Sequence, residues 1–228
     1  MIFETLKQFD DIHTHVMGNP RAVCSLPPEE AITLSRTSQD QPFSIMLHPW
    51  HICQYSGHDL LSQFAKAVSI CSTDERFVAI GECGLDSECD TPLTDQIACF
   101  EQALLIARQY QKPVILHIVR MWDQLLLSTR AIFGQGGAAA ADAEGCRLIV
   151  HGYRKNLSLA KQLVAQGYYL SLGNKFNPEV LADIDTEKIY RETDETAKWS
   201  HLSNQKVQKI GISTKKFGKK LADNQYFH

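Results

Sequence analysis

Asp11-Ile12-His13-Thr14-His15 is the stretch of this 228-residue chain that decides how its fold is interpreted. We predict a strand over residues 9–13 that ends at these histidines. Side chains alternate between the two faces of a strand, so His13 and His15 are expected to point the same way, together with Asp11. Two imidazoles on one face can bind one cation, although histidines at a strand end can equally form ordinary hydrogen bonds. Asp11 could then be a ligand or a carboxylate that orients one.

The composition is that of an ordinary globular protein. An apolar fraction of 44% and a charged fraction of 21% predict one sizeable core, so we expect a single domain over residues 1–228. A net charge of −3 gives no general attraction to nucleic acid or anionic membranes, so a phosphate group would need a local site. The seven cysteines contain no Cys-x-x-Cys pair, which favours a reducing compartment over a disulfide framework. Without a signal peptide or an apolar run of membrane-spanning length, we expect a cytoplasmic protein with no membrane partner.

Short apolar runs alternate with amphipathic helical patterns, which predicts βαβ units and a parallel sheet. We predict seven strands, at residues 9–13, 43–47, 77–80, 114–116, 148–150, 168–172 and 188–191. Helical patterns open at Pro27 and cover residues 58–70, 92–109, 121–133 and 157–165. Seven or eight such units favour a TIM-type (β/α) barrel over a doubly wound sheet, because no glycine-rich turn follows the first strand. Residues 134–145 are expected to form a flexible loop, and the chain is expected to be helical from Asp194 to its end, with Ser213 capping the last helix.

Six side chains of metal-ligand type fall at the carboxyl ends of five predicted strands. They are His13, His15, Glu82, His117, His151 and Asp194. In a barrel these strand ends converge on one mouth, where barrel enzymes keep their active sites. Mixed nitrogen and oxygen ligands suit Zn²⁺, Mn²⁺ or Mg²⁺, and a carboxylate can bridge two ions about 3.5–4 Å apart. Such a pair promotes in-line displacement at phosphorus, so we predict hydrolysis of a phosphate ester. With six ligands available, Asp11 is expected to support the site and not to bind metal.

Seven segments in order along the chain carry a resemblance to a known family. They are residues 11–15 (DIHTH), 48–50 (HPW), 81–86 (GECGLD), 112–117 (KPVILH), 151–152 (HG), 171–173 (SLG) and 192–194 (ETD). The chain resembles the TatD family of metal-dependent hydrolases, amidohydrolase-like barrels whose best-known activity is deoxyribonuclease. The resemblance implies two divalent ions, and the ligands follow in this order. His13, His15 and Asp194 would hold one ion, His117 and His151 the other, and Glu82 would bridge them. Asp194 is then our candidate to orient or deprotonate the attacking water.

The substrate is less defined than the metal site. His48 and Arg154 are candidate phosphate contacts, while a packed loop histidine and a solvated surface charge are the ordinary interpretations of the same residues. The chain departs from the family pattern around the expected mouth, at residues 17, 119, 152–155 and 195–198. We expect DNA or a small phosphoester as substrate, with no obligate protein partner. A barrel hydrolase of small-molecule esters or amides is the alternative, and a binding barrel without catalysis is a third possibility.

Overall fold

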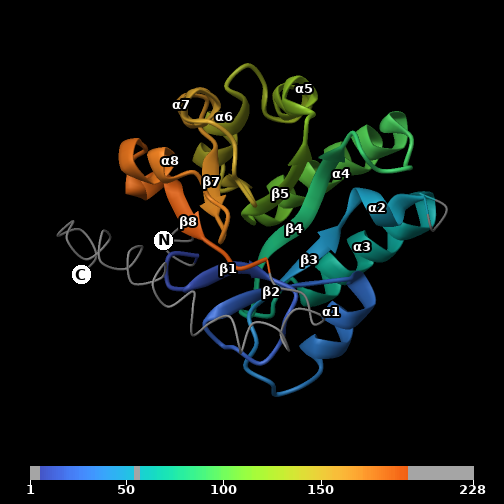
Figure 1. Cartoon of the computed structure of the whole chain (residues 1–228). Helices are drawn as coiled ribbons and strands as arrows, with labels where there is room; N and C mark the ends of the chain where they lie inside the picture. The colour runs from blue at the N-terminus through green and yellow to red at the C-terminus, as the bar shows by residue number, and fades with distance from the viewer. Residues whose placement is uncertain (1–5, 54–56, 195–228) are drawn as a thin grey trace. The chain divides into compact units, whose positions relative to one another are not determined.

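The computed structural model describes residues 6–53 and 57–194, and these form one eight-stranded parallel sheet (Figure 1). Each strand pairs with the next strand along the chain, so the sheet order is the sequence order. The strands are β1 (Asp11–Thr14), β2 (Ala22–Leu26), β3 (Phe43–Leu47), β4 (Phe77–Asp86), β5 (Val114–Val119), β6 (Leu148–Val150), β7 (Tyr169–Leu172) and β8 (Ile189–Arg191). This is the TIM-type barrel that the sequence predicts, nearly closed, since β1 and β8 lie side by side.

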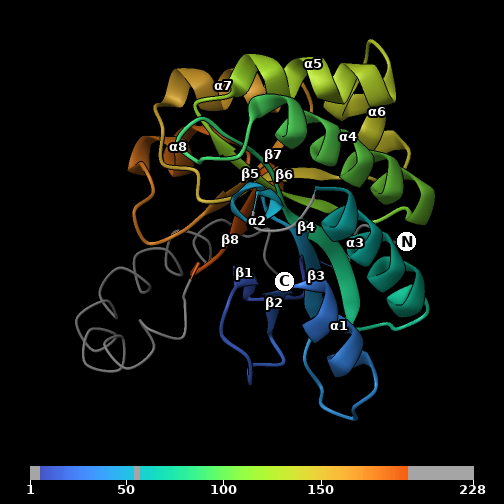
Figure 2. The same ribbon diagram turned by 90° about the vertical axis from the view of Figure 1, so that its right-hand side faces the viewer.

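Helices follow strands β2 to β7 and lie on the outside of the barrel (Figures 1 and 2). They are α1 (Pro28–Ser35), α2 (Pro49–Ile52), α3 (Gly57–Cys71), α4 (Leu93–Tyr110), α5 (Trp122–Phe133), α6 (Gly137–Ala143), α7 (Leu157–Ala165), α8 (Pro178–Asp183) and the 3-10 turn η1 (Thr186–Lys188). Five of them match the predicted helices. None of the helices in the described ranges has both the length and the apolar character that crossing a membrane requires.

The barrel interior is filled by side chains from most of the strands. One buried cluster combines residues of six strands with Leu6, which precedes β1; the strand residues are Ile12, Val23, Val78, Ile149, Tyr169 and Tyr190. Residues from strands on all sides can meet only inside the barrel, so this cluster is its packed core. The core lies below the strand carboxyl ends and leaves those ends available for polar side chains.

Three expectations about the elements are wrong. Strand β2 is missing from the prediction. Its five residues include Ser25 and lie between prolines, a pattern that is typical of a loop. Strands β4 and β5 continue past their predicted ends, so Glu82 and His117 lie within strands and not after them. Residues 134–145 contain helix α6, because the alanine run outweighs the flanking glycines. The predicted helix after Asp194 and its cap at Ser213 lie outside the described residues, and the single domain over residues 1–228 stays a prediction.

Gly84 explains why β4 can extend so far. Its φ is +154°, and a Cβ atom at this position would lie 2.0 Å from the carbonyl oxygen of His117 on β5. Only glycine permits that approach, and Gly84 pairs directly with His117 in the ladder. The glycines that suggest a strand end in the sequence therefore allow β4 to stay paired up to the mouth.

Asp11 joins the first strand to the last. Its Oδ1 accepts hydrogen bonds from the backbone N–H groups of His13 (3.0 Å) and Thr193 (3.1 Å), and its Oδ2 accepts one from Thr193 Oγ1 (2.6 Å). The N–H of Asp194 also donates to the carbonyl of His13 at 3.0 Å. These bonds close the barrel where no β8–β1 ladder is formed among the described strands. Asp11 thus has the supporting position that we expected.

Replacing Asp11 by alanine should lower the free energy of unfolding by about 1–3 kcal/mol, because buried donors lose their acceptor. The matched control is Asp10→Ala, which removes an exposed pair with Arg21 and should cost less than about 1 kcal/mol. Urea denaturation of both variants measures the difference. Equal losses in the two variants would contradict the closing role of Asp11.

Candidate metal centre

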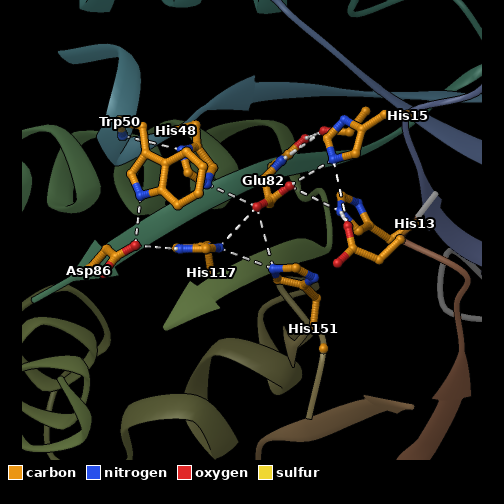
Figure 3. A network of polar contacts seen from close by, with 12 residues as sticks. His13, His15, His48, Trp50, Glu82, Asp86, His117 and His151 are labelled. Atoms are coloured by element: carbon orange, nitrogen blue, oxygen red, sulfur yellow. Dashed lines mark hydrogen bonds and ion pairs between the residues drawn. The ribbon is translucent and has the colours of Figure 1, made fainter. Parts of the chain in front are cut away.

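The side chain of Glu82 lies at the centre of a cluster of histidines (Figure 3). It extends from β4 and is 5% exposed. Its Oε2 faces the first strand, at 3.0 Å from His13 Nε2 and 3.3 Å from His15 Nε2. His13 lies on β1 and His15 directly follows it, so the sequence correctly places both imidazoles on one face.

The second oxygen of Glu82 faces the opposite side of the mouth. Its Oε1 lies 3.0 Å from His117 Nδ1 on β5 and 3.4 Å from His151 Nε2, just after β6. The two imidazoles also approach each other, with 3.2 Å between His117 Nδ1 and His151 Nε2. Each carboxylate oxygen of Glu82 therefore faces two of the four histidines predicted as ligands.

Asp194 completes the set from the segment after β8. Its Oδ1 lies 3.6 Å from His13 Nε2 and 3.8 Å from His15 Nε2. Its backbone adopts a left-handed φ of +51°, a conformation that aspartate tolerates better than most residues. The side chain is 49% exposed, so this carboxylate borders the open side of the site. All six predicted ligands therefore come together at the strand carboxyl ends.

His48 also contacts Glu82, but its hydrogen bonding differs from that of the other histidines. Its Nε2 lies 3.0 Å from Glu82 Oε1, and its Nδ1 accepts the backbone N–H of Trp50 at 3.2 Å. Burial lowers the pKa of His48, so the ring is neutral at pH 7. A neutral ring whose Nδ1 accepts carries its proton on Nε2, and that proton points to Glu82. His48 is therefore positioned to orient the carboxylate, and its role as a phosphate contact stays a prediction.

Two further carboxylates lie behind the histidines. Asp86 Oδ2 is 3.1 Å from His117 Nε2, so a carboxylate faces each nitrogen of this ring; with a metal ion at Nδ1, Asp86 would hold the proton on Nε2. Glu192 is buried, accepts the N–H of Gly152 at 2.5 Å and lies 3.6 Å from His151 Nδ1. Neither carboxylate is among the site residues predicted from the sequence. The signal was available, because they belong to the quoted segments 81–86 and 192–194.

Arg154 lies outside this cluster. It is exposed in the loop after β6, one residue beyond the buried Tyr153. Its role as a phosphate contact stays a prediction.

Burial and charge act against each other in this site. Burial opposes ionisation of Glu82, but the charges of His151 and His13 prevail and hold its pKa well below the ordinary value. Burial likewise disfavours protonated His13, yet Glu82 and Asp194 raise its pKa to about 9. For His151, burial is again outweighed, chiefly by the charge of Glu82, and the pKa is raised well above its usual value. When no metal ion is bound, protons on His13 and His151 must compensate the negative charge of the buried Glu82.

The residues fit divalent metal ions. Ligand atoms 2.0–2.2 Å from one ion lie about 3–3.6 Å from each other, and the Glu82–imidazole distances fall in that range. Within the described part of the chain, Nδ1 of the fully buried His13 and Nδ1 of His151 have no hydrogen-bond partner, and His13 Nε2 lies 3.0 Å from Glu82 Oε2 without hydrogen-bond geometry. Buried polar atoms without partners are rare, and at a site of this composition a metal ion would satisfy them. Three sets of ligand atoms converge closely enough to hold an ion: His13–His15–Glu82, His13–His151–Asp194 and His48–Glu82–His117.

Metal binding should strengthen as the pH rises. A proton on His13 or His151 must leave before the nitrogen can bind a metal, so a pKa of about 9 for His13 means competition at pH 7. The affinity for Zn²⁺ or Mn²⁺ should increase by up to about tenfold per pH unit for each proton released, from pH 6 towards pH 9. Calorimetric titration in buffers of different ionisation enthalpy measures the protons released. An affinity independent of pH would show that these imidazoles are not ligands.

Comparison with known proteins agrees with this geometry. The family model described as TatD related DNase matches residues 13–209. An uncharacterized metal-dependent hydrolase from Haemophilus influenzae is 26% identical over 167 residues, 67% of this chain and 58% of that protein. The uncharacterized metal-dependent hydrolase YjjV of Escherichia coli K12 is 27% identical over 172 residues, 72% of this chain and 61% of that protein. This chain thus spans about three-fifths of the length of these curated relatives.

A crystal structure of YjjV, a TatD homolog from Escherichia coli K12, has the same fold. It superposes with a TM-score of 0.65 at 23% identity, covering 83% of this chain and 80% of YjjV. The family match extends over most of the chain, and it includes all six ligand-type residues around the mouth. This protein therefore belongs to the TatD-related DNase family.

Proposed function

We propose that this protein is a divalent-metal-dependent hydrolase that cleaves phosphodiester bonds, with DNA as its substrate class. The observation that carries the proposal is the position of Glu82, whose two oxygens face separate pairs of histidines. A carboxylate placed in this way can bridge two ions about 3.5–4 Å apart. We assign two ions, Zn²⁺, Mn²⁺ or Mg²⁺, with His13 and His15 on one side of Glu82 and His117 and His151 on the other.

Asp194 is the proposed base. Burial alone would raise its pKa, but His13 and His151 lower it, so the carboxylate is ionised at neutral pH. The Asp194 side chain is half exposed, so its carboxylate can orient a water molecule and accept a proton from that water. When bound, the divalent ions supply the Lewis acidity that activates this water and neutralises charge on the phosphate. His48 and Asp86 keep Glu82 and His117 in the orientation that holds the ions.

Family membership supports this proposal. The matched family model is that of TatD-related DNases, and the curated relatives are named metal-dependent hydrolases. A metal-dependent hydrolase is therefore the activity we assign first, and DNA cleavage is the more specific part of the proposal.

A pocket of about 280 Å³ favours a second candidate, the hydrolysis of a small-molecule ester, amide or phosphoester. The pocket adjoins the metal centre at His48, and its lining combines the buried Met46 and Leu47 with the exposed Glu29 and Glu30. Carboxylates on this wall repel a polyanionic strand, whereas a neutral or cationic leaving group suits them. Two hydrolysis rates separate the candidates, one on oligodeoxynucleotides and one on bis(4-nitrophenyl) phosphate. Both rates are measured in the presence of Zn²⁺, Mn²⁺ or Mg²⁺ in turn. Turnover of the small diester without cleavage of DNA would favour the second.

Two substitutions test the assigned roles. Glu82→Gln should abolish turnover and reduce the bound metal below two ions per chain, because the bridging charge is lost. Asp194→Asn should lower kcat by about 10²–10⁴-fold, since the base is removed while the other ligands stay. Metal content by mass spectrometry and kinetics on a phosphodiester measure both effects.

The matched control for these variants is Asp183→Asn, which removes an exposed carboxylate paired with Lys161. It should leave kcat and metal content unchanged. Full turnover in Glu82→Gln would reject Glu82 as the bridge, and an unchanged kcat in Asp194→Asn would reject Asp194 as the base.

A further inference from the structure

Trp50 combines exposure with a fixed position at the metal centre. Its side chain lies in the first turn of α2, and the residue is 53% exposed, which is unusual for so large an apolar side chain. Its indole Nε1–H donates a hydrogen bond to Asp86 Oδ2 at 2.7 Å, and its backbone N–H donates to His48 Nδ1. Asp86 is itself buried, so the indole is attached to a rigid part of the barrel.

The ring stands directly beside the cluster around Glu82 (Figure 3). Its centroid lies 5.1 Å from that of His48 and 6.0 Å from that of His117, with edge-on geometry in both cases. These contacts and the bond to Asp86 fix the orientation of the ring, while about half of its surface stays open to solvent. Holding Asp86 requires only a donor, so the hydrogen bond does not account for the exposed aromatic surface.

We propose that the open face of Trp50 binds the nucleobase of a nucleotide substrate by stacking, while the phosphate lies at the Glu82 cluster. This inference rests on the proposed phosphodiesterase function and names the part of the substrate that is recognised beside the reacting group. Stacking on an aromatic ring accepts every base, because each base has a π-face. A ring that is already immobilised loses little conformational entropy when the base binds. The net charge of −3 also favours recognition of a base over attraction of the backbone alone.

Two ligands with the same phosphate and sugar test the proposal. Thymidine 5′-monophosphate carries a base, and deoxyribose 5-phosphate does not. Calorimetric titration of the metal-loaded protein should show about 5- to 150-fold tighter binding of the nucleotide. In Trp50→Leu the ratio of the two affinities should fall to about one, with deoxyribose 5-phosphate bound as before. Trp50→Phe keeps an aromatic ring without the N–H and should retain most of the ratio.

The matched control is Leu127→Ala, which shortens an exposed apolar side chain on α5 and should leave the ratio unchanged. Metal content is measured for each variant, because Trp50 also touches Asp86 and, through it, His117. Equal weakening of both ligands in Trp50→Leu would overturn the proposal and assign Trp50 a positioning role. An unchanged ratio in Trp50→Leu, or no preference for the nucleotide in the unaltered protein, would also overturn it.

The outcome is separate from that of the proposed function, because binding is measured without turnover. A base-dependent affinity that Trp50→Leu removes, in a protein that cleaves no phosphodiester, would support stacking and reject the phosphodiesterase function. Cleavage of DNA by a protein without this affinity would support the phosphodiesterase function and reject stacking on Trp50.

Discussion

The buried carboxylate of Glu82 is the constraint on which the rest of this site depends. An ion removed from water costs several kcal/mol unless other charges compensate it, and Glu82 is 5% exposed. The chain provides that compensation with imidazoles, which can carry either a proton or a metal. This explains why the pKa of Glu82 is depressed while those of His13 and His151 are raised. The same arrangement that stabilises the metal-free protein is ready to exchange its protons for a divalent ion.

The barrel satisfies this constraint because parallel strands end together. Each ligand-type residue comes from a different strand end, apart from the pair His13 and His15, and none needs a long loop to reach the centre. The residues behind the ligands come from the same strand ends, as Asp86 on β4 and Glu192 after β8 illustrate. A site assembled in this way is as rigid as the sheet. That rigidity holds the ligand side chains in one geometry.

The sequence predicts the barrel and the six ligand-type residues because both depend on local patterns, namely apolar runs and the polar residues that follow them. It fails where partners distant in the chain decide the outcome. Strand β2 contains Ser25 and exists because β1 and β3 pair with it on either side. Strand β4 passes through glycines because β5 approaches there. The role of His48 depends on where its ring proton lies, which follows from the N–H of Trp50 and Glu82 together and cannot be read from the letters His-Pro-Trp.

The bonds from Asp11 to Thr193 have a consequence for how the protein is made. They connect residues 182 positions apart, and Asp194 follows directly after them. A ribosome must therefore synthesise nearly all of the described barrel before the last ligand can join the first two. Until then the growing chain carries His13 and His15 without the Asp194 carboxylate that faces them. The candidate metal centre is therefore complete only when the last strand of the barrel has joined the first.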